Sequence, residues 1–357
     1  MLTKAVQKLF FISAILVIFT LASCQKDTNP NDPDPIPDGV KDSTLLIKSI
    51  AYLFDNGMNG QDSIVEHYSY DSVNRKITLT WDDASDNYVV DGTSAEFAYN
   101  NKGLLSRVVY KYPADYTPAD YDYKTVGILY DAENILQKIT TELGDGNIES
   151  LQFNKTMLPS GNYQLSWEET DPALPDETFP RKIIFNADGK SIIVILEHLF
   201  KPAGENFYAN VIIKDSLAYD ATGNVSKVFT NISDTLNQYN ESYTSFDFLT
   251  RQTKGDQLYN QRKVIMNGIA NIPFDYSDLG SFIADEAVGI LSITLSNEYL
   301  QYSKYPIQQA KVRMWDGSFR DFTANSEFDN TNRLTKFKGF FRDYDLELIE
   351  YKISYYK

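Results

Sequence analysis

The stretch LAYDATGNVSKV (residues 217–228) contains a short pattern that recurs along this 357-residue chain. An aromatic residue is followed directly by Asp or Asn, and the fourth position after the aromatic residue is Gly or Asn. Six copies are present: YDSVNRK (70–76), YNNKGLL (99–105), YDAENIL (130–136), FNADGKS (185–191), YDATGNV (219–225) and FDNTNRL (328–334).

The two constrained positions have a common physical reason. Asp or Asn opens a type I turn by accepting a backbone hydrogen bond, and Gly or Asn tolerates the left-handed conformation that closes it. A type I turn followed by a left-handed residue is a three-residue β-hairpin loop with a bulge. We therefore expect hairpin turns built on the pairs Asp71 and Asn74, Asn100 and Gly103, Asp131 and Asn134, Asn186 and Gly189, Asp220 and Gly223, and Asp329 and Asn332.

The sequence on both sides of these turns alternates between apolar and polar residues. KITLTW (76–81) and YKISYY (351–356) both have this period of two, which is typical of strands with one face in a core and one in water. The spacing of the turns predicts about 12–16 strands. The expected fold is all-β, an antiparallel hairpin-repeat sheet rolled into a barrel or half-barrel, with one short helix near 278–289 and a single domain over residues 44–357.

The N-terminus has the features of a lipoprotein signal peptide, residues 1–23. Lys4 and Lys8 precede the apolar run 9–20, which is too short for a spanning helix. The run ends in Leu-Ala-Ser-Cys (21–24), which resembles the bacterial lipobox, and Cys24 is the only cysteine of the chain. The resemblance implies cleavage before Cys24 and lipid attached to it. The alternative is an ordinary secretory signal with an unrelated cysteine.

The segment that follows is expected to be an extended tether. Residues 24–43 are rich in Pro and Asp and contain too few apolar side chains to fold. Its start, Gln25-Lys26-Asp27, resembles the surface-export signal of Bacteroidota lipoproteins. The formal charge of the chain is −16, which argues against nucleic acid as a partner because nucleic-acid binding needs clustered Lys and Arg. The lipid anchor makes the membrane a partner.

The sequence contains little that indicates catalysis. Its two histidines, His67 and His198, lie in strand-like segments, and no catalytic or phosphate-binding motif is present. Carboxylate pairs cannot be identified from sequence, because 49 acidic residues are present. The stretch 55–66 partly matches a calcium loop but lacks a ligand at its third position, so we favour a hairpin loop. We expect no enzyme activity, no cofactor and no metal.

Binding is expected at the edge of the sheet opposite the tight turns. Long connections should gather there, at 82–92, 112–123 and 171–180, and long loops on a rigid sheet commonly carry function. The candidate ligand-binding residues are Tyr112, Tyr116, Tyr121, Tyr123 and Trp81. Exposed tyrosines can stack on sugars, which makes a glycan platform possible. The alternative is that these rings close over the end of the core.

The repeated units resemble the YD repeats of Rhs-type and teneurin-type proteins. With the lipobox, they resemble even more a family of uncharacterised Bacteroidota lipoproteins that is described as having a porin-like β-fold. The resemblance implies a rolled antiparallel sheet and carries no activity. We therefore expect a lipoprotein anchored in the outer membrane, exposed at the cell surface and acting as a non-enzymatic binding module for a glycan or protein. The alternatives are a periplasm-facing structural or envelope-assembly protein and a carboxylate-based glycan hydrolase.

Overall fold

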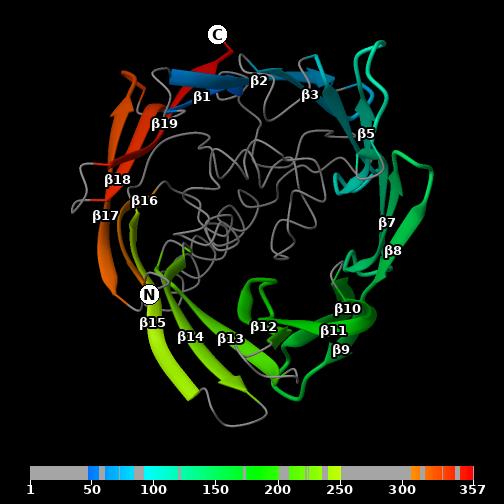
Figure 1. Cartoon of the computed structure of the whole chain (residues 1–357), viewed down its shortest axis with the longest axis vertical. Helices are drawn as coiled ribbons and strands as arrows, with labels where there is room; N and C mark the ends of the chain where they lie inside the picture. The colour runs from blue at the N-terminus through cyan, green and yellow to red at the C-terminus, as the bar shows by residue number, and fades with distance from the viewer. Residues whose placement is uncertain are drawn as a thin grey trace, which may run out of the picture. The chain divides into compact units, whose positions relative to one another are not determined.

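The computed structural model describes residues 47–55, 61–71, 73–83, 92–119, 122–171, 174–200, 209–221, 223, 225–234, 240–250, 307–313, 318–331, 333–341 and 346–356. All of them belong to one compact unit, Pro35–Lys357. They form 19 strands of one antiparallel sheet (Figure 1). The strands are β1 (Ile47–Asp55), β2 (Gln61–Asp71), β3 (Lys76–Asp83), β4 (Ser94–Tyr99), β5 (Leu105–Lys111), β6 (Tyr123–Tyr130), β7 (Leu136–Leu143), β8 (Ile148–Gln152), β9 (Asn154–Met157), β10 (Tyr163–Asp171), β11 (Leu174–Phe185), β12 (Ser191–Phe200), β13 (Ala209–Tyr219), β14 (Val225–Asp234), β15 (Asn240–Thr250), β16 (Ile307–Arg313), β17 (Phe319–Phe328), β18 (Leu334–Phe341) and β19 (Leu346–Tyr355).

Strands that follow one another in the chain are neighbours in the sheet. Each pairs with the next, apart from β8 and β9, which are two parts of one stretch separated by Phe153. In this stretch β8 pairs with β7 and β9 pairs with β10. The first strand, β1, pairs with β2 and also with the last strand, β19. The two ends of the described sheet are therefore hydrogen-bonded to each other. The expected fold class, an antiparallel hairpin sheet that rolls up, is confirmed, with more strands than the predicted 12–16.

The repeated motif forms the expected hairpin turn, which we call a corner: the aromatic residue and the six residues after it. In the corner 130–136, the backbone N–H of Asp131 donates to the carbonyl of Ile135 (2.8 Å). The Asp131 carboxylate accepts the N–H groups of Glu133 and Ile135 at 2.8 and 2.9 Å, and Asn134 is left-handed, with φ 68°. The same side-chain bonds recur at Asn100, Asn186 and Asp329, and Gly103, Gly189 and Gly223 are also left-handed.

The first corner differs from the prediction. In 70–76 the left-handed residue is Arg75, with φ 52°, instead of Asn74. Asp71 pairs directly with Lys76, so this loop has four residues between its paired ends. Asn74 instead donates to the Asp71 carboxylate through its backbone N–H (3.0 Å) and its side-chain amide (2.7 Å). The extra residue therefore moves the left-handed position by one. Asn332 lies outside the described residues.

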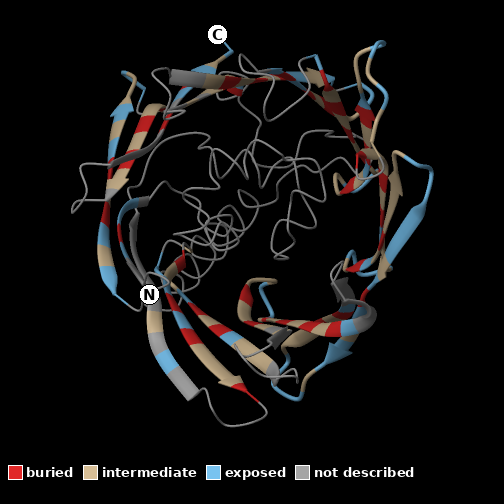
Figure 2. Cartoon of the chain, viewed as in Figure 1, coloured by how far each residue is buried: buried red, intermediate tan, exposed pale blue. Residues whose placement is uncertain are grey.

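The core lies on one face of the sheet. Buried and less buried residues alternate along β4, where Ala95, Phe97 and Tyr99 are buried (Figure 2). The largest fully buried side chains include Trp81, Phe97, Phe322 and Phe337. Thr78 and Glu96, which alternate with buried neighbours, are only partly buried. The period-2 pattern in the sequence therefore identified the core face.

Two features differ from the sequence-based expectation. The predicted loop 171–180 is mostly strand, because β11 begins at Leu174 and pairs with β10. Two further tight turns, Leu143–Asn147 and Leu158–Asn162, have the backbone hydrogen bonds of a corner and left-handed Gly146 and Gly161. The predicted helix at 278–289 lies outside the described residues. In the part of the chain that the structure describes, no helix has the length and hydropathy needed to cross a membrane.

Candidate binding edge

The antiparallel pairing sorts the connections between strands onto two edges of the sheet. One edge, which we call the corner edge, carries all six corners and the turn Leu158–Asn162. The opposite edge, which we call the loop edge, carries the connections 83–94, 111–123, 143–148 and 171–174 among others. Only on the loop edge does the described part of the chain contain a long non-strand connection, and this is the Tyr-rich segment between β5 and β6.

The segment 112–122 is braced by its own side chains. The Tyr116 hydroxyl donates to the Asp122 carboxylate (2.8 Å), which also accepts the backbone N–H of Ala119 (2.5 Å). The Tyr112 hydroxyl donates to the carbonyl of Tyr123 (3.0 Å), and the rings of Tyr112 and Tyr116 lie 5.3 Å apart between centroids. Backbone bonds from Tyr116 to Pro113 and from Asp122 to Ala119 close two turns within the segment. These bonds link the described parts of the loop, 112–119 and Asp122, to each other.

The surroundings of Tyr112 keep its hydroxyl protonated, so that it remains a hydrogen-bond donor. Burial raises the pKa of the Tyr112 hydroxyl well above its usual value, and the nearby Asp122 carboxylate raises this pKa further. Asp122 is only 7% exposed. A carboxylate in this position would be costly without partners, and the bonds from Tyr116 and Ala119 supply them.

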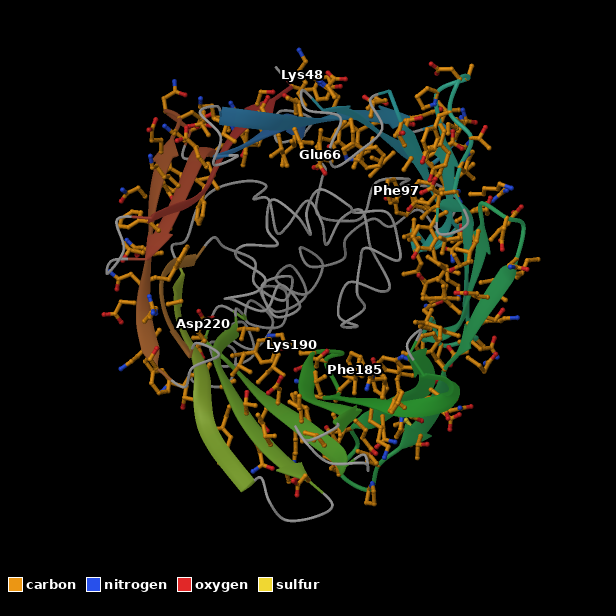
Figure 3. All side chains as sticks on the ribbon, in the orientation of Figure 1. Lys48, Glu66, Phe97, Phe185, Lys190 and Asp220 are labelled. Carbon is orange, nitrogen blue, oxygen red and sulfur yellow. The ribbon has the colours of Figure 1, made fainter. Side chains whose placement is uncertain are left out.

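A row of polar and aromatic side chains lies beside the loop on the core face. Glu66 pairs in register with Trp81, and its carboxylate accepts the Trp81 indole N–H (3.3 Å) and the Tyr68 hydroxyl. The backbone of Trp81 is hydrogen-bonded to Thr93 (3.2 Å). Figure 3 shows Glu66 and Phe97 pointing to the same side of the sheet and Lys48 pointing to the other. The row continues from Thr93 towards the braced loop, since Ser94 pairs with Lys111.

One member of this row is left without a partner. The Thr93 hydroxyl is buried, and among the described residues it is the buried side-chain atom with no hydrogen-bond partner. A buried hydroxyl without a partner loses its hydration and gains nothing in exchange. The loop edge therefore contains one unused hydrogen-bonding group directly beneath its connections.

The structure places the predicted binding residues differently. Tyr112, Tyr116 and Tyr123 come together at one loop: the hydroxyls of Tyr112 and Tyr116 donate hydrogen bonds there, and the ring of Tyr123 lies 6.2 Å from that of Tyr110 between centroids. Trp81 is only 2% exposed, so its ring has no free face on which a ligand can stack, and the prediction for Trp81 is wrong in this structure. Tyr121 and Cys24 lie outside the described residues.

Sequence reasoning missed Glu66 and Thr93 as site residues, and it noted Asp122 only as one of the acidic residues between the tyrosines of 112–123. Glu66 was noticed only as the last position of a possible calcium loop, yet its carboxylate bonds to Tyr68 and Trp81. Its alternation with Ile64 and Tyr68, in phase with the core, was the available signal. Residues 56–60 of that loop lie outside the described residues. In the described part of the chain, no group of three His, Cys, Asp or Glu side chains has the arrangement of a metal site.

The buried carboxylates on the core face are far apart. Glu66 on β2 and Asp122 before β6 are separated by four strand steps, about 19 Å along the sheet. Asp234 pairs with Val211, four residues before Asp215, which gives about 13 Å. The two carboxyl groups of glycoside hydrolases lie about 5–9.5 Å apart. Neither pair has that spacing.

The opposite face of the sheet is charged. Glu96 accepts an ion pair from Lys76 at 2.7 Å and lies 3.8 Å from Lys111. The hydrogen bond from Lys76 lowers the pKa of Glu96. Glu350 lies 3.0 to 3.8 Å from the ammonium groups of Lys336, Lys338 and Lys352. Networks of ion pairs therefore lie on this face in the described part of the sheet.

Comparisons with known proteins find similar solved structures at low sequence identity. No protein-family model and no curated protein matches the chain. Among solved structures, the chain is similar to a porin-like protein from Bacteroides uniformis, with 13% identity and a TM-score of 0.34, over 88% of this chain and 97% of the other. It is also similar to TcdB2-TccC3 without its hypervariable C-terminal region, with 10% identity and a TM-score of 0.22, over 80% of this chain and 15% of that one. Neither similarity carries an argument about function.

Proposed function

We propose that the protein is a lipoprotein anchored in the outer membrane through Cys24, exposed at the cell surface, and that it acts as a non-enzymatic binding module through its loop edge. The observation that carries this proposal is the braced segment 112–122. Because Tyr112, Tyr116 and Asp122 already link its described parts, a ligand would have less of the loop to order on binding. Ala114, Asp115 and Thr117 remain exposed on it for contact.

Two further observations support the proposal. The charged face around Glu96 and Glu350 favours a body in water that is held by lipid, because a sheet face in contact with lipid is apolar. The wide spacing of the buried carboxylates favours binding over glycoside hydrolysis.

Protease accessibility of the full chain on intact cells tests the location. We expect a protease added outside to digest the body while a periplasmic control protein stays intact. Protection until the outer membrane is broken would contradict surface exposure and favour the periplasmic envelope-assembly alternative.

Capture of the detergent-solubilised full chain on a panel of immobilised polysaccharides tests the ligand class. The double variant Tyr116→Ala, Tyr121→Ala should lower capture at least tenfold, because it removes the brace and the two ring faces. Asp188→Ala, which alters an exposed position on the corner edge, is the matched control and should bind like the unaltered chain. Equal capture by the double variant would exclude the loop as the binding site, and release of reducing ends from any of the polysaccharides would show that the protein is an enzyme.

A further inference from the structure

The pairing of β19 with β1 has the register of a corner. In five corners the aromatic residue pairs with the sixth residue after it, and the residue before the aromatic pairs with the eighth, so one residue is skipped. In the corner 99–105, for example, Tyr99 pairs with Leu105 and Ala98 pairs with Arg107. We call the pairing of β19 with β1 the seam. There, Tyr355 pairs with Ile47 and Ser354 pairs with Ser49, and Lys48 is skipped.

The seam also has the burial pattern of a corner. The sixth residue after the aromatic is buried in each of these five corners: Leu105, Leu136, Ser191, Val225 and Leu334. Ile47, which takes this place at the seam, is 0% exposed. Lys48, the residue skipped at the seam, is exposed and points to the outer face (Figure 3). Position by position, Tyr355 and Ile47 therefore match the two ends of a corner.

A chain of tyrosine hydrogen bonds runs through the corners and includes the seam. The hydroxyl of Tyr130 donates to the carbonyl of Leu105 (2.7 Å), which is the sixth residue after the aromatic of the preceding corner. Tyr355 donates in the same way to Leu334 (2.8 Å). Tyr70, the aromatic of the next corner, donates to Ile47 (3.0 Å). At the seam, Tyr355 therefore donates to the preceding corner as a corner aromatic does, and Ile47 accepts from the next corner as the sixth residue of a corner does.

The seam differs from the corners in one respect, its lack of a covalent turn. Among the described strands, β19 and β1 are the paired neighbours that lie farthest apart in the chain, and the bonded hydroxyls of Ser49 and Ser354 are 305 residues apart. Pairing over such a separation has the largest loop-closure cost in the sheet. In the sequence, the predicted tether (24–43) precedes Ile47, the first residue of β1.

We propose that the β19–β1 pair is a corner split by the two ends of the chain, and that it works as the latch by which the sheet closes and opens. Closure then depends on contacts at the seam alone: the ladder of β1 with β19, the Ser49–Ser354 hydrogen bond, and Tyr356, which donates to Tyr68 (2.6 Å) and packs edge-on against Tyr70. The latch opens before the corners do, because each corner is held by a covalent turn.

A disulfide across the seam tests the latch in the full chain. Ser49→Cys with Ser354→Cys replaces two hydroxyls whose oxygens are 2.6 Å apart, and Cys24 is the chain's only other cysteine. The matched control is Ala98→Cys with Arg107→Cys, the equivalent positions of the corner 99–105. Oxidation of the seam pair should raise the thermal unfolding midpoint by several degrees more than oxidation of the control pair, because it closes a far longer loop. The reduced form of each variant shows the effect of the substitutions alone.

Hydrogen exchange on the unaltered chain provides an independent test. Amides of β1 and β19 should exchange at least about tenfold faster than amides of β4 and β5, and the seam disulfide should remove the difference. Equal exchange in the two pairs of strands, equal stabilisation by the two disulfides, or failure of the seam cysteines to form a disulfide would each overturn the latch.

Discussion

The ammonium group of Lys190 lies 5.1 Å from the centroid of the Tyr219 ring, and the Tyr219 hydroxyl donates to the carbonyl of Ser191, the residue next to Lys190 (2.6 Å). Arg333, Leu334 and Tyr355 repeat this arrangement, with 4.6 Å between the guanidinium and the ring. Each of these corners therefore makes two contacts with the tyrosine of the next unit: a cation over its ring and a backbone carbonyl that accepts its hydroxyl. The aromatic position of the motif is explained by this contact between units rather than by the turn itself.

Removal of the Tyr219 hydroxyl should weaken the link between two units. Tyr219→Phe keeps the ring under Lys190 and loses the bond to Ser191, so the free energy of unfolding should fall by about 1 kcal/mol. Urea denaturation measures this change. Tyr163→Phe is the control, because Tyr163 contacts Phe185 through its stacked ring at 4.8 Å, and it should change stability by less than half as much.

The left-handed corner position should accept Asn better than Ala. Gly189 has φ 73°, and a Cβ placed there meets no atom within 4 Å, so only the backbone conformation opposes a side chain. Gly189→Ala should therefore destabilise the protein by about 1–2 kcal/mol. Gly189→Asn should cost less than half of that, because Asn134 already adopts this conformation in an equivalent corner. Equal losses for the two variants in thermal unfolding would contradict the left-handed assignment.

The sequence predicted the corners well and the binding edge poorly. A corner is determined by residues that are close in sequence, whereas the binding edge depends on residues that are distant in sequence. Asp131 and Asn134 fix their turn within five residues, so their spacing alone reveals it. The turns at Gly146 and Gly161 escaped because Leu143 and Leu158 stand where the motif has Asp or Asn, and the backbone makes the same bonds without that side chain.

The fate of the loop residues depended on neighbours that are distant in sequence. Trp81 was predicted to contact a ligand. The acceptor of its indole N–H, Glu66, lies on the adjacent strand, whereas the period-2 pattern of 76–81 by itself placed Trp81 on the core face with Ile77 and Leu79. The seam could not be found from the motif either. The motif spans seven consecutive residues, whereas Ile47 and Tyr355 lie near opposite ends of the chain.

A glycine in β18 should tolerate no side chain. A Cβ at Gly339 would lie 2.7 Å from the ring of Phe322, which is fully buried and cannot move aside. Gly339→Ala should destabilise the protein by about 1–3 kcal/mol through overpacking. Gly127→Ala is the matched control in another strand, because its Cβ would meet only the Thr140 carbonyl at 3.9 Å. A loss for Gly127→Ala as large as that for Gly339→Ala in urea denaturation would show that strand propensity, not packing, is responsible.

The corner at Asp329 should make stability depend on pH. Burial opposes ionisation of this carboxyl, but hydrogen bonds from Arg333 and Thr331 outweigh it and lower its pKa from 3.8 to about 2. The Asp329 carboxylate accepts the Arg333 Nε–H (2.6 Å) and the backbone N–H groups of Thr331 and Arg333. Because the pKa is lower in the folded state, its stabilising contribution is complete above pH 3.8 and is lost as the pH falls towards 2.

Replacement of this carboxylate shows the contribution directly. Asp329→Asn should lower the free energy of unfolding by about 1 kcal/mol at pH 7, since Asn keeps one acceptor oxygen but loses the charge that Arg333 contacts. The difference from the unaltered chain should shrink as the pH falls through 2, because Asp329 then becomes protonated and both chains approach neutrality at this position. Asn186→Asp is the converse variant, because Asn186 accepts the same two backbone hydrogen bonds. The free energy of unfolding of this variant should rise only above the pKa of the new carboxyl group. A loss in Asp329→Asn that stays constant from pH 7 to pH 2 would assign the effect to shape rather than charge.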